Sequence, residues 1–383
     1  MTAPMAGAER DSATSGESSA QERREFADSL RRLLASEWSL DSVRSGAVAG
    51  PSVHTSLWKR LVGEMGLPGV AIPEEFGGSG LSDVEQVVAF TETGRALAAG
   101  PLLSTAGFAI SALTRSGDRA AQARLLPMIA AGSIGAVAHA DHRGAVHAGT
   151  GVTATRFRTG WLLDGTAAAM LHGQDAEVLL VFAESAEGLT LFEVPSTSGV
   201  TRVPREHLDL TRGTADLSFA STPAVPVGPE GAGAATRRHM IEDVSYLVAA
   251  EAVGGSERCL EMARDYAVVR HQFGRAIGSF QAIKHRLAHM AVAVESSRAA
   301  LEGSMAETTS LPAERAALAS AVKSYCCDAF LDVARSALHV HGGIGFTWEH
   351  DAHLYLRRAK ALQLIGGPGH YHRGLIAAHL GLD

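Results

Sequence analysis

The chain has 383 residues, 46% of them hydrophobic and 20% charged, which is typical of a globular protein with a sizeable buried core. A formal net charge of −7 argues against a nucleic-acid-binding protein, which would normally present a basic surface. The three cysteines form no disulfide framework, and no apolar run is long enough to span a bilayer. We therefore expect a soluble cytoplasmic protein of two or three domains that binds neither nucleic acid nor membrane.

The first two-thirds of the chain divides into three regions of different pattern. Residues 1–21 are small and polar and lack the apolar core of a signal peptide, which predicts a disordered tail. Residues 22–133 predict a helical domain, because apolar residues recur at three- and four-residue spacings. Ser82 before Asp83 is typical of a helix start. Residues 134–228 predict an all-β domain of short β-rich runs between Gly, Ser, Pro and Thr clusters.

Residues 229–383 return to helical patterns. Long apolar stripes predict helices at about 235–268, 279–307, 312–340, 349–364 and 371–381. Gly366, Gly367, Pro368 and Gly369 break the last two of these helices apart. The predicted fold class is thus an N-terminal all-α domain, a middle β-barrel or sandwich domain, and a C-terminal four-helix bundle.

Three motifs are more specific than this periodicity. They are AIPEEFGGSGLS at 71–82, RHQFGRAIGSFQAIK at 270–284 and HGGIGFTWEHDAHLYLRRAK at 341–360. Together they resemble the acyl-CoA dehydrogenase family, over nearly the whole chain from about residue 22. The resemblance implies FAD-dependent removal of hydrogens from Cα and Cβ of an acyl-CoA thioester. In this family a glutamate takes the α proton, the flavin takes the β hydride, and each flavin is held by two subunits.

The resemblance implies a set of cofactor-binding residues in the bundle: Arg270, Gln272, Phe273, Ile277, Gln281, His339, Gly342, Gly343 and Gly345. An arginine suits a pyrophosphate, and glycines permit close approach of the backbone to the adenosine diphosphate part. His339 stands where the family usually has Gln. Without the resemblance, the glycines would be interpreted as a helix end and Arg270 as half of a surface ion pair.

The residue that should act as base is missing. The family's glutamate aligns with Gly366, and the threonine that usually follows is Pro368. The alternative base position on the first bundle helix aligns with Val244. Glu251 remains a weak candidate base, since burial in an apolar run could raise its pKa, although such a group is more often a paired structural charge. Further candidates are Asp243, His370 and His372, although a histidine in a turn is most often simply a residue near solvent.

The β domain departs from the family in the same direction. The run from His139 to Val146 replaces a strand end that contacts flavin and substrate, and Ala169-Met170-Leu171 replaces the family's Trp-Ile-Thr. His139, Asp141, His142 and His147 lack a metal-ligand spacing, so we expect no metal.

The contacts to a subunit's own flavin are thus lost, while those that reach a partner's flavin are kept. This resembles the non-catalytic subunit of α2β2 acyl-CoA dehydrogenases, several of which act on bulky thioesters such as sterol side chains. The main hypothesis is a chain that shares FAD with a homologous subunit. Two alternatives stay open: a self-sufficient homomeric enzyme with a base such as Glu251, and a flavin-free scaffold or non-redox enzyme on this fold.

Overall fold

The N-terminal third of the chain is helical, as predicted. The computed structural model describes residues 8–44, 55–140, 149–196, 199–206, 208–306 and 312–382. Its first elements are α1 (Ala8–Glu37), α2 (Asp41–Arg44), α3 (Thr55–Gly63), η1 (Leu67–Gly69), η2 (Glu74–Phe76), α4 (Asp83–Arg95), η3 (Leu103–Ala109), α5 (Ile110–Ser116) and α6 (Arg119–Ala130). Helix α4 starts as the sequence indicates, because the Ser82 side chain accepts from the Val84 amide and Glu85 completes a capping box.

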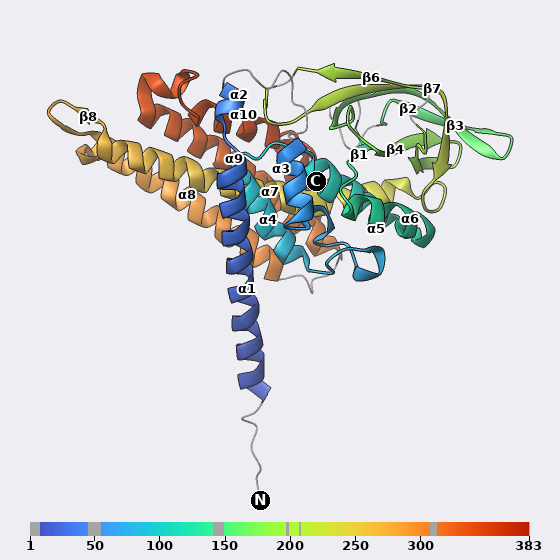
Figure 1. Cartoon of the computed structure of the whole chain (residues 1–383), viewed down its shortest axis with the longest axis horizontal. Coiled ribbons are helices and arrows are strands. Elements are labelled where there is room, and N and C mark those ends of the chain that lie inside the picture. The colour runs from blue at the N-terminus through green and yellow to red at the C-terminus, as the bar shows by residue number, and fades with distance from the viewer. Residues whose placement is uncertain are drawn as a thin grey trace, which may run out of the picture.

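Helix α1 begins at Ala8, within the segment for which the sequence predicts a disordered tail. From Ala8 to Gln21 the segment contains no proline, and its Ala, Glu, Gln and Arg residues are good helix formers. Once the following amphipathic turns are helical, extension toward the N-terminus costs little. Figure 1 shows the N-terminal half of α1 running away from the rest of the molecule.

The middle of the chain forms a closed sheet. Its strands are β1 (Gly135–Ala138), β2 (Val152–Phe157), β3 (Gly160–Leu171), β4 (Val178–Ser185), β5 (Gly188–Glu193), β6 (Val200–Arg205) and β7 (Thr214–Pro226). Strand pairing runs β4-β2-β3-β7-β5 and returns from β5 to β4, with β1 added beside β4 and β6 beside β7. The predicted β-barrel is therefore confirmed, and an apolar cluster that includes Trp161, Leu163 and Phe192 is its core.

The C-terminal region is the predicted bundle. It comprises α7 (Gly233–Val269), β8 (His271–Gln272), β9 (Arg275–Ala276), η4 (Ile277–Ser279), α8 (Gln281–Ala306), α9 (Pro312–His341), η5 (Gly342–Phe346), α10 (Ala352–Leu362) and α11 (Gly369–His379). Helices α7, α8 and α9 pack side by side, and the β8–β9 hairpin projects from the far end of this group (Figure 1).

Helix α7 is the central element, since it packs on α4 of the first domain as well as on α9. Two glycines permit its close contact with α4. A Cβ atom at Gly254 would lie 1.9 Å from the Thr91 carbonyl oxygen, and one at Gly94 would lie 2.4 Å from that of Glu251. The backbones of the two helices therefore touch directly, which fixes α7 against the first domain.

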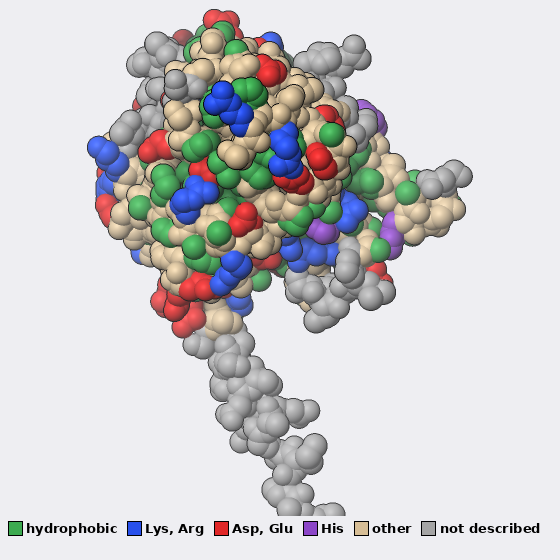
Figure 2. All heavy atoms as spheres, turned by 90° about the vertical axis from the view of Figure 1, so that its right-hand side faces the viewer, with side chains coloured by type: hydrophobic (Ala, Val, Ile, Leu, Met, Phe, Trp, Pro, Cys, Tyr) green, Lys and Arg blue, Asp and Glu red, His purple; other side chains and the backbone are tan. Residues whose placement is uncertain are grey.

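Over the described part of the chain, no helix is long and apolar enough to cross a bilayer, and no group of three or more metal-ligating side chains gathers. Figure 2 shows the face at the β-domain end, where Lys and Arg are interspersed with Asp and Glu. That face carries no extended patch of one sign.

Candidate functional site

A cavity of about 420 Å³ lies between the barrel and the end of α10. Its wall is formed by the end of β1, the last turn of η3, the second half of β3, the loop before β7, and the turn after α10. The side chains are mostly alkyl, with His139, Asp209, Arg212, Thr214 and Lys360 as the polar members. The cavity is large enough for a small organic molecule and offers few groups to orient one.

The turn after α10 supplies one wall of this cavity. Gly366 and Gly367 have φ angles of +71° and +112°, so the backbone leaves the helical path where the sequence predicts a break. The Lys323 ammonium, fully buried on α9, donates to the Gln363 carbonyl oxygen at 2.9 Å and to that of Gly367. This buried cation holds the turn in place.

His372 holds the same turn from α11. Its Nε2 lies 3.1 Å from the Gly366 carbonyl oxygen, so Nε2–H donates, and its Nδ1 lies 3.2 Å from the Ser320 hydroxyl oxygen. Burial lowers the pKa of His372 to about 4. His372 is only 1% exposed, so the interpretation of both His370 and His372 as solvent-near turn residues is wrong for His372 and holds for the exposed His370.

The two positions where the resemblance expects a base face each other. A Cβ atom at Gly366 would lie 3.9 Å from Cγ1 of Val244, and Val244 is fully buried. The turn and α7 thus meet at one point beside the cavity, and neither residue there can accept a proton.

Glu251 lies in a buried network of charges instead. Its carboxylate accepts from Arg212, and the Arg358 guanidinium stands 3.6 Å away. Arg358 in turn donates to Asp209 at 2.6 Å. Glu251 is 3% exposed and does not line the larger cavity, which favours the paired structural charge over the candidate base.

Asp209 is the strongly perturbed carboxylate of this network. Burial opposes its ionisation, but the charges of Arg358 and Arg212 outweigh burial and lower its pKa to about 2. Sequence reasoning missed Asp209, Arg212 and Arg358. A signal was present for Arg358, which stands on the apolar face of α10 between Leu354 and Leu362, where a charged residue needs a buried partner.

His139 lies in the cavity wall with its ring stacked on Phe108, the centroids 4.4 Å apart. Its Nδ1 lies 3.1 Å from the Val137 carbonyl oxygen, so the neutral ring carries its hydrogen on Nδ1 and has a free lone pair on Nε2. Burial lowers the pKa of His139 to about 4. Asp141, His142 and His147 lie outside the described residues.

The β3 segment Ala169-Met170-Leu171, which replaces the family's Trp-Ile-Thr in the resemblance, also lines the cavity. The register of β3 against β7 shifts between Ala167 and Met170, and Ala169 within this bulge has a φ of +50°. The Ala169 amide donates to the Asp216 carboxylate at 2.8 Å, which supports the bulge. The side chains of Ala169, Met170 and Leu171 present only hydrocarbon and sulfur to the cavity.

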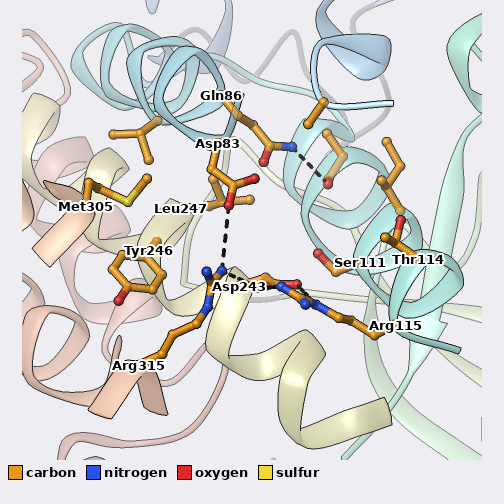
Figure 3. Close-up of a pocket in the computed structure, with 14 residues that line it drawn as sticks. Asp83, Gln86, Ser111, Thr114, Arg115, Asp243, Tyr246, Leu247, Met305 and Arg315 are labelled. Carbon is orange, nitrogen blue, oxygen red and sulfur yellow. Dashed lines mark hydrogen bonds and ion pairs between the residues drawn. The ribbon is translucent and has the colours of Figure 1, made fainter. Parts of the chain in front are cut away.

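Asp243 is engaged elsewhere. It lines a second cavity, of about 170 Å³, between α4, α5 and α7. Figure 3 shows Arg115 and Arg315 pointing at Asp243 from two sides, with donor-to-oxygen distances of 2.7 and 2.6 Å for Arg115 and 3.0 Å for Arg315. Asp243 is therefore a satisfied ion-pair partner away from the larger cavity.

The residues expected to bind the cofactor lie apart from both cavities, on the far end of the bundle. Seven of the nine are exposed, Ile277 is half-buried and Gly345 is buried. Phe273, at the tip of the β8–β9 hairpin, is 91% exposed and has a φ of +53°. These residues form an open surface of one chain.

Arg270 has no carboxylate partner and no hydrogen-bond acceptor among the residues that the structure describes. Its neighbour Arg264, by contrast, pairs with Asp265 at 2.8 Å. The alternative interpretation of Arg270 as half of a surface ion pair is therefore not supported within this chain. An exposed, unpaired guanidinium suits a diphosphate brought from outside.

The glycines of η5 differ in what the fold requires of them. Gly342 has a φ of +64° and closes α9, while a Cβ atom at Gly345 would lie 2.9 Å from the Leu338 carbonyl oxygen. The fold does not require a glycine at position 343, since a Cβ atom there would meet nothing within 4 Å. The helix-end interpretation explains Gly342 and leaves Gly343 unexplained.

The comparisons with known proteins agree with this architecture. The acyl-CoA dehydrogenase N-terminal domain matches residues 20–133, and the acyl-CoA dehydrogenase C-terminal domain matches residues 231–381. Acyl-CoA dehydrogenase IpdE2 of Mycolicibacterium smegmatis is 30% identical over 349 residues, which cover 91% of this chain and 96% of that protein.

Two solved structures are similar over 94% of this chain. One is a variant of the Tcur3481-Tcur3483 steroid ACAD, with 28% identity, a TM-score of 0.84 and 98% of that chain covered. The other is the ChsE4-ChsE5 complex from Mycobacterium tuberculosis, with 26% identity, a TM-score of 0.83 and 97% of that chain covered.

An α-helical domain, a β-barrel and a helix bundle in this order make up the acyl-CoA dehydrogenase fold. This chain belongs to the acyl-CoA dehydrogenase family.

Proposed function

We propose that this chain is the supporting subunit of a heteromeric acyl-CoA dehydrogenase. The observation that carries the proposal is the meeting of Gly366 and Val244 beside the cavity, which leaves both expected base positions without a titratable group. A partner chain of the same family would supply the base. The ChsE4-ChsE5 relative is itself described as a complex of two named components, which supports a heteromer.

The chemistry requires a proton acceptor next to Cα of the acyl group and a hydride acceptor next to Cβ. FAD supplies the hydride acceptor when it is bound. The large cavity of this chain offers alkyl side chains at the β3 bulge and glycine at the turn, so it fits the reacting part of such a site poorly. The Glu251 carboxylate is held by two arginines and does not reach the cavity.

The exposed end of the bundle fits the other half of a shared cofactor site. Arg270 offers an unpaired cation, and Gly343 leaves its backbone open to a close approach. In the proposal, these residues and the seven others of the predicted set contact the adenosine diphosphate part of FAD held with the partner. We propose an α2β2 assembly that acts on a bulky acyl-CoA, in line with the steroid relative.

The same proposal places the protein in the cytoplasm. Cys259, Cys326 and Cys327 are free and buried, which suits a reducing compartment.

One observation favours the self-sufficient homomer as a second candidate. The chain contains a cavity of about 420 Å³ of its own, and the His139 side chain in the cavity wall has an unprotonated Nε2. The flavin content of the protein separates the candidates. We expect the chain purified alone to be nearly colourless and the complex with its homologous partner to be yellow. Stoichiometric FAD bound to the lone chain after gel filtration would contradict the supporting-subunit proposal. A colourless complex would favour the flavin-free scaffold.

Arg270→Ala tests the cofactor contact directly. The variant should fold normally, because an exposed arginine contributes little stability. The complex should lose FAD affinity by about tenfold to a hundredfold, since a hydrogen bond to a charged group contributes about 1.5–3 kcal/mol. Arg264→Ala, which removes an exposed and paired arginine of the same helix, is the matched control and should leave FAD affinity unchanged. Unchanged FAD affinity in Arg270→Ala contradicts the proposed contact.

A further inference from the structure

The two exposed segments that carry the expected cofactor contacts are joined by a row of three rings, called the ring stack below, whose neighbouring planes are tilted by 33° and 47°. The ring of His341 lies between those of Tyr266 and His350, with centroid distances of 4.6 and 4.2 Å. Tyr266 is on α7, one turn before Arg270, and the Arg270 amide donates to the Tyr266 carbonyl oxygen at 2.9 Å. His341 is the last residue of α9 and directly precedes Gly342.

Each ring is anchored in its own segment. His341 is 3% exposed, and its Nδ1–H donates to the Ala337 carbonyl oxygen at 2.7 Å. His350 accepts from the Ala352 amide at 3.1 Å, which ties it to the start of α10. Its neighbour Asp351 pairs with Arg44 of α2. The stack therefore connects the end of α7, the η5 segment and the loop before α10.

The helices that precede these segments, α7 and α9, pack against each other and bring the two segments to the same end of the bundle. The β8–β9 hairpin returns to α7 through the Ile277 amide, which donates to the Arg270 carbonyl oxygen at 2.8 Å. On the η5 side, Gly342 and Gly343 have open space around their Cβ positions. Neither glycine has a side chain to pack there, so the rings beneath add to the packing of α7 on α9, and to the contact of Gly345 with Leu338, in setting the position of Gly343 relative to Arg270.

We propose that His341, held between Tyr266 and His350, is a positioning residue that sets the distance between the hairpin segment Arg270–Gln281 and the segment Gly342–Phe346. The identity of what the two segments bind, FAD shared with a partner chain, rests on the proposed function. The positioning itself is a property of this chain and is measured without a partner.

The first measurement is amide hydrogen exchange of the chain alone. His341→Ala removes the central ring, and exchange of the Thr347, Arg270 and Ile277 amides should rise about tenfold, because two ring contacts are lost. His341→Phe keeps a ring in the stack and should restore exchange to within about twofold of the wild type. Phe192→Leu, which breaks a ring contact of 5.3 Å inside the barrel, controls for a general loss of stability and should not affect these amides.

The second measurement is FAD affinity in the complex with the homologous chain. His341→Ala should weaken it by about tenfold, and His341→Phe should leave it near the wild-type value, because the ring and not the imidazole nitrogen is required. Phe192→Leu should again have no effect.

The outcomes separate this inference from the proposed function. If exchange in His341→Ala is unchanged, the positioning role is wrong and the proposed function stands. If exchange rises while FAD affinity is unaffected in both His341→Ala and Arg270→Ala, the proposed cofactor contact is wrong and with it the role of the stack in binding. If His341→Phe behaves like His341→Ala in exchange and affinity, the ring stack does not act as proposed.

Discussion

Gly343 is a residue whose identity the fold of this chain leaves unexplained. Its side-chain position faces open space, and it does not adopt a positive φ angle. A glycine that nothing in its own chain requires is flexible in the unfolded state and gives no packing in return. A ligand or partner that approaches the backbone closely gives a physical reason for it.

Gly343→Ala tests whether a ligand approaches the backbone closely at this residue. The lone chain should be as stable as the wild type or slightly more stable, by up to about 1 kcal/mol, because alanine restricts the unfolded chain. FAD affinity of the complex should fall. Gly345→Ala is the contrasting variant, since its Cβ would clash with the Leu338 carbonyl and should lower the melting temperature of the lone chain. Normal FAD affinity in Gly343→Ala would mean that no close approach occurs at this residue.

Glu251 is the opposite case, because its carboxylate is already paired with two buried arginines of the same chain. Glu251→Gln leaves Arg212 and Arg358 in the interior with one carboxylate fewer, and should destabilise the protein by about 3–5 kcal/mol. Turnover of the complex per folded molecule should stay nearly unchanged. Glu75→Gln, at an exposed pair with Arg119, is the matched control and should change stability by at most about 1 kcal/mol. Abolished turnover with intact stability would instead make Glu251 the base.

At the scale of elements, the turn between α10 and α11 keeps a defined shape although it lacks the expected carboxylate. Lys323 from α9 and His372 from α11 bind its carbonyl oxygens, so three helices determine where residue 366 lies. The fold thus fixes the place of residue 366, and the residue there is a glycine.

Gly366→Glu should not give the lone chain acyl-CoA oxidation. A carboxylate there would meet Val244 and face a cavity whose β3 wall offers no hydrogen-bonding side chain, and a base without a positioned hydride acceptor contributes little. Gly366→Ala controls for the backbone, because any side chain at a φ of +71° is strained. Substantial oxidation by Gly366→Glu without a partner would show that the cavity accepts a flavin and that the chain is self-sufficient.

At the scale of the whole molecule, buried neutral histidines make stability depend on pH. The pKa of His372 falls from an ordinary value of 6.5 to about 4, because burial disfavours the charged ring. The unfolded chain therefore binds more protons than the folded chain between these values. The stability contributed by His372 is complete above pH 6.5 and is lost as the pH falls toward 4.

The unfolding free energy of the lone chain should thus decrease on acidification from pH 6.5 to 4, with a contribution of about 3 kcal/mol from His372. Denaturant titrations at several pH values measure the slope of the unfolding free energy against pH. His372→Gln should reduce this slope and leave the contribution of His139, whose pKa is also about 4, whereas His370→Gln, at the exposed neighbouring histidine, should not change it. An equal slope in His372→Gln and the wild type would contradict the assignment.

The whole fold also shows what a single sequence can and cannot predict. Apolar periodicity correctly gave the bundle helices, the barrel strands and the break before Gly369 because these depend on local pattern. It could not give the contact of Lys323 with Gln363, forty residues away, or the pairing of Arg212 with Glu251. Such contacts depend on which elements meet in space, and a buried charge shows in the sequence only as a polar residue on an apolar face.

The left-handed backbone at Gly366 has a consequence for how this chain can change over generations. A single base change turns a GGA or GGG glycine codon into one for glutamate, so the genetic code does not keep this position free of a carboxylate. The φ of +71° opposes one, because it penalises a side chain by about 1–2 kcal/mol. A glutamate here would carry that cost until the turn changed its shape as well.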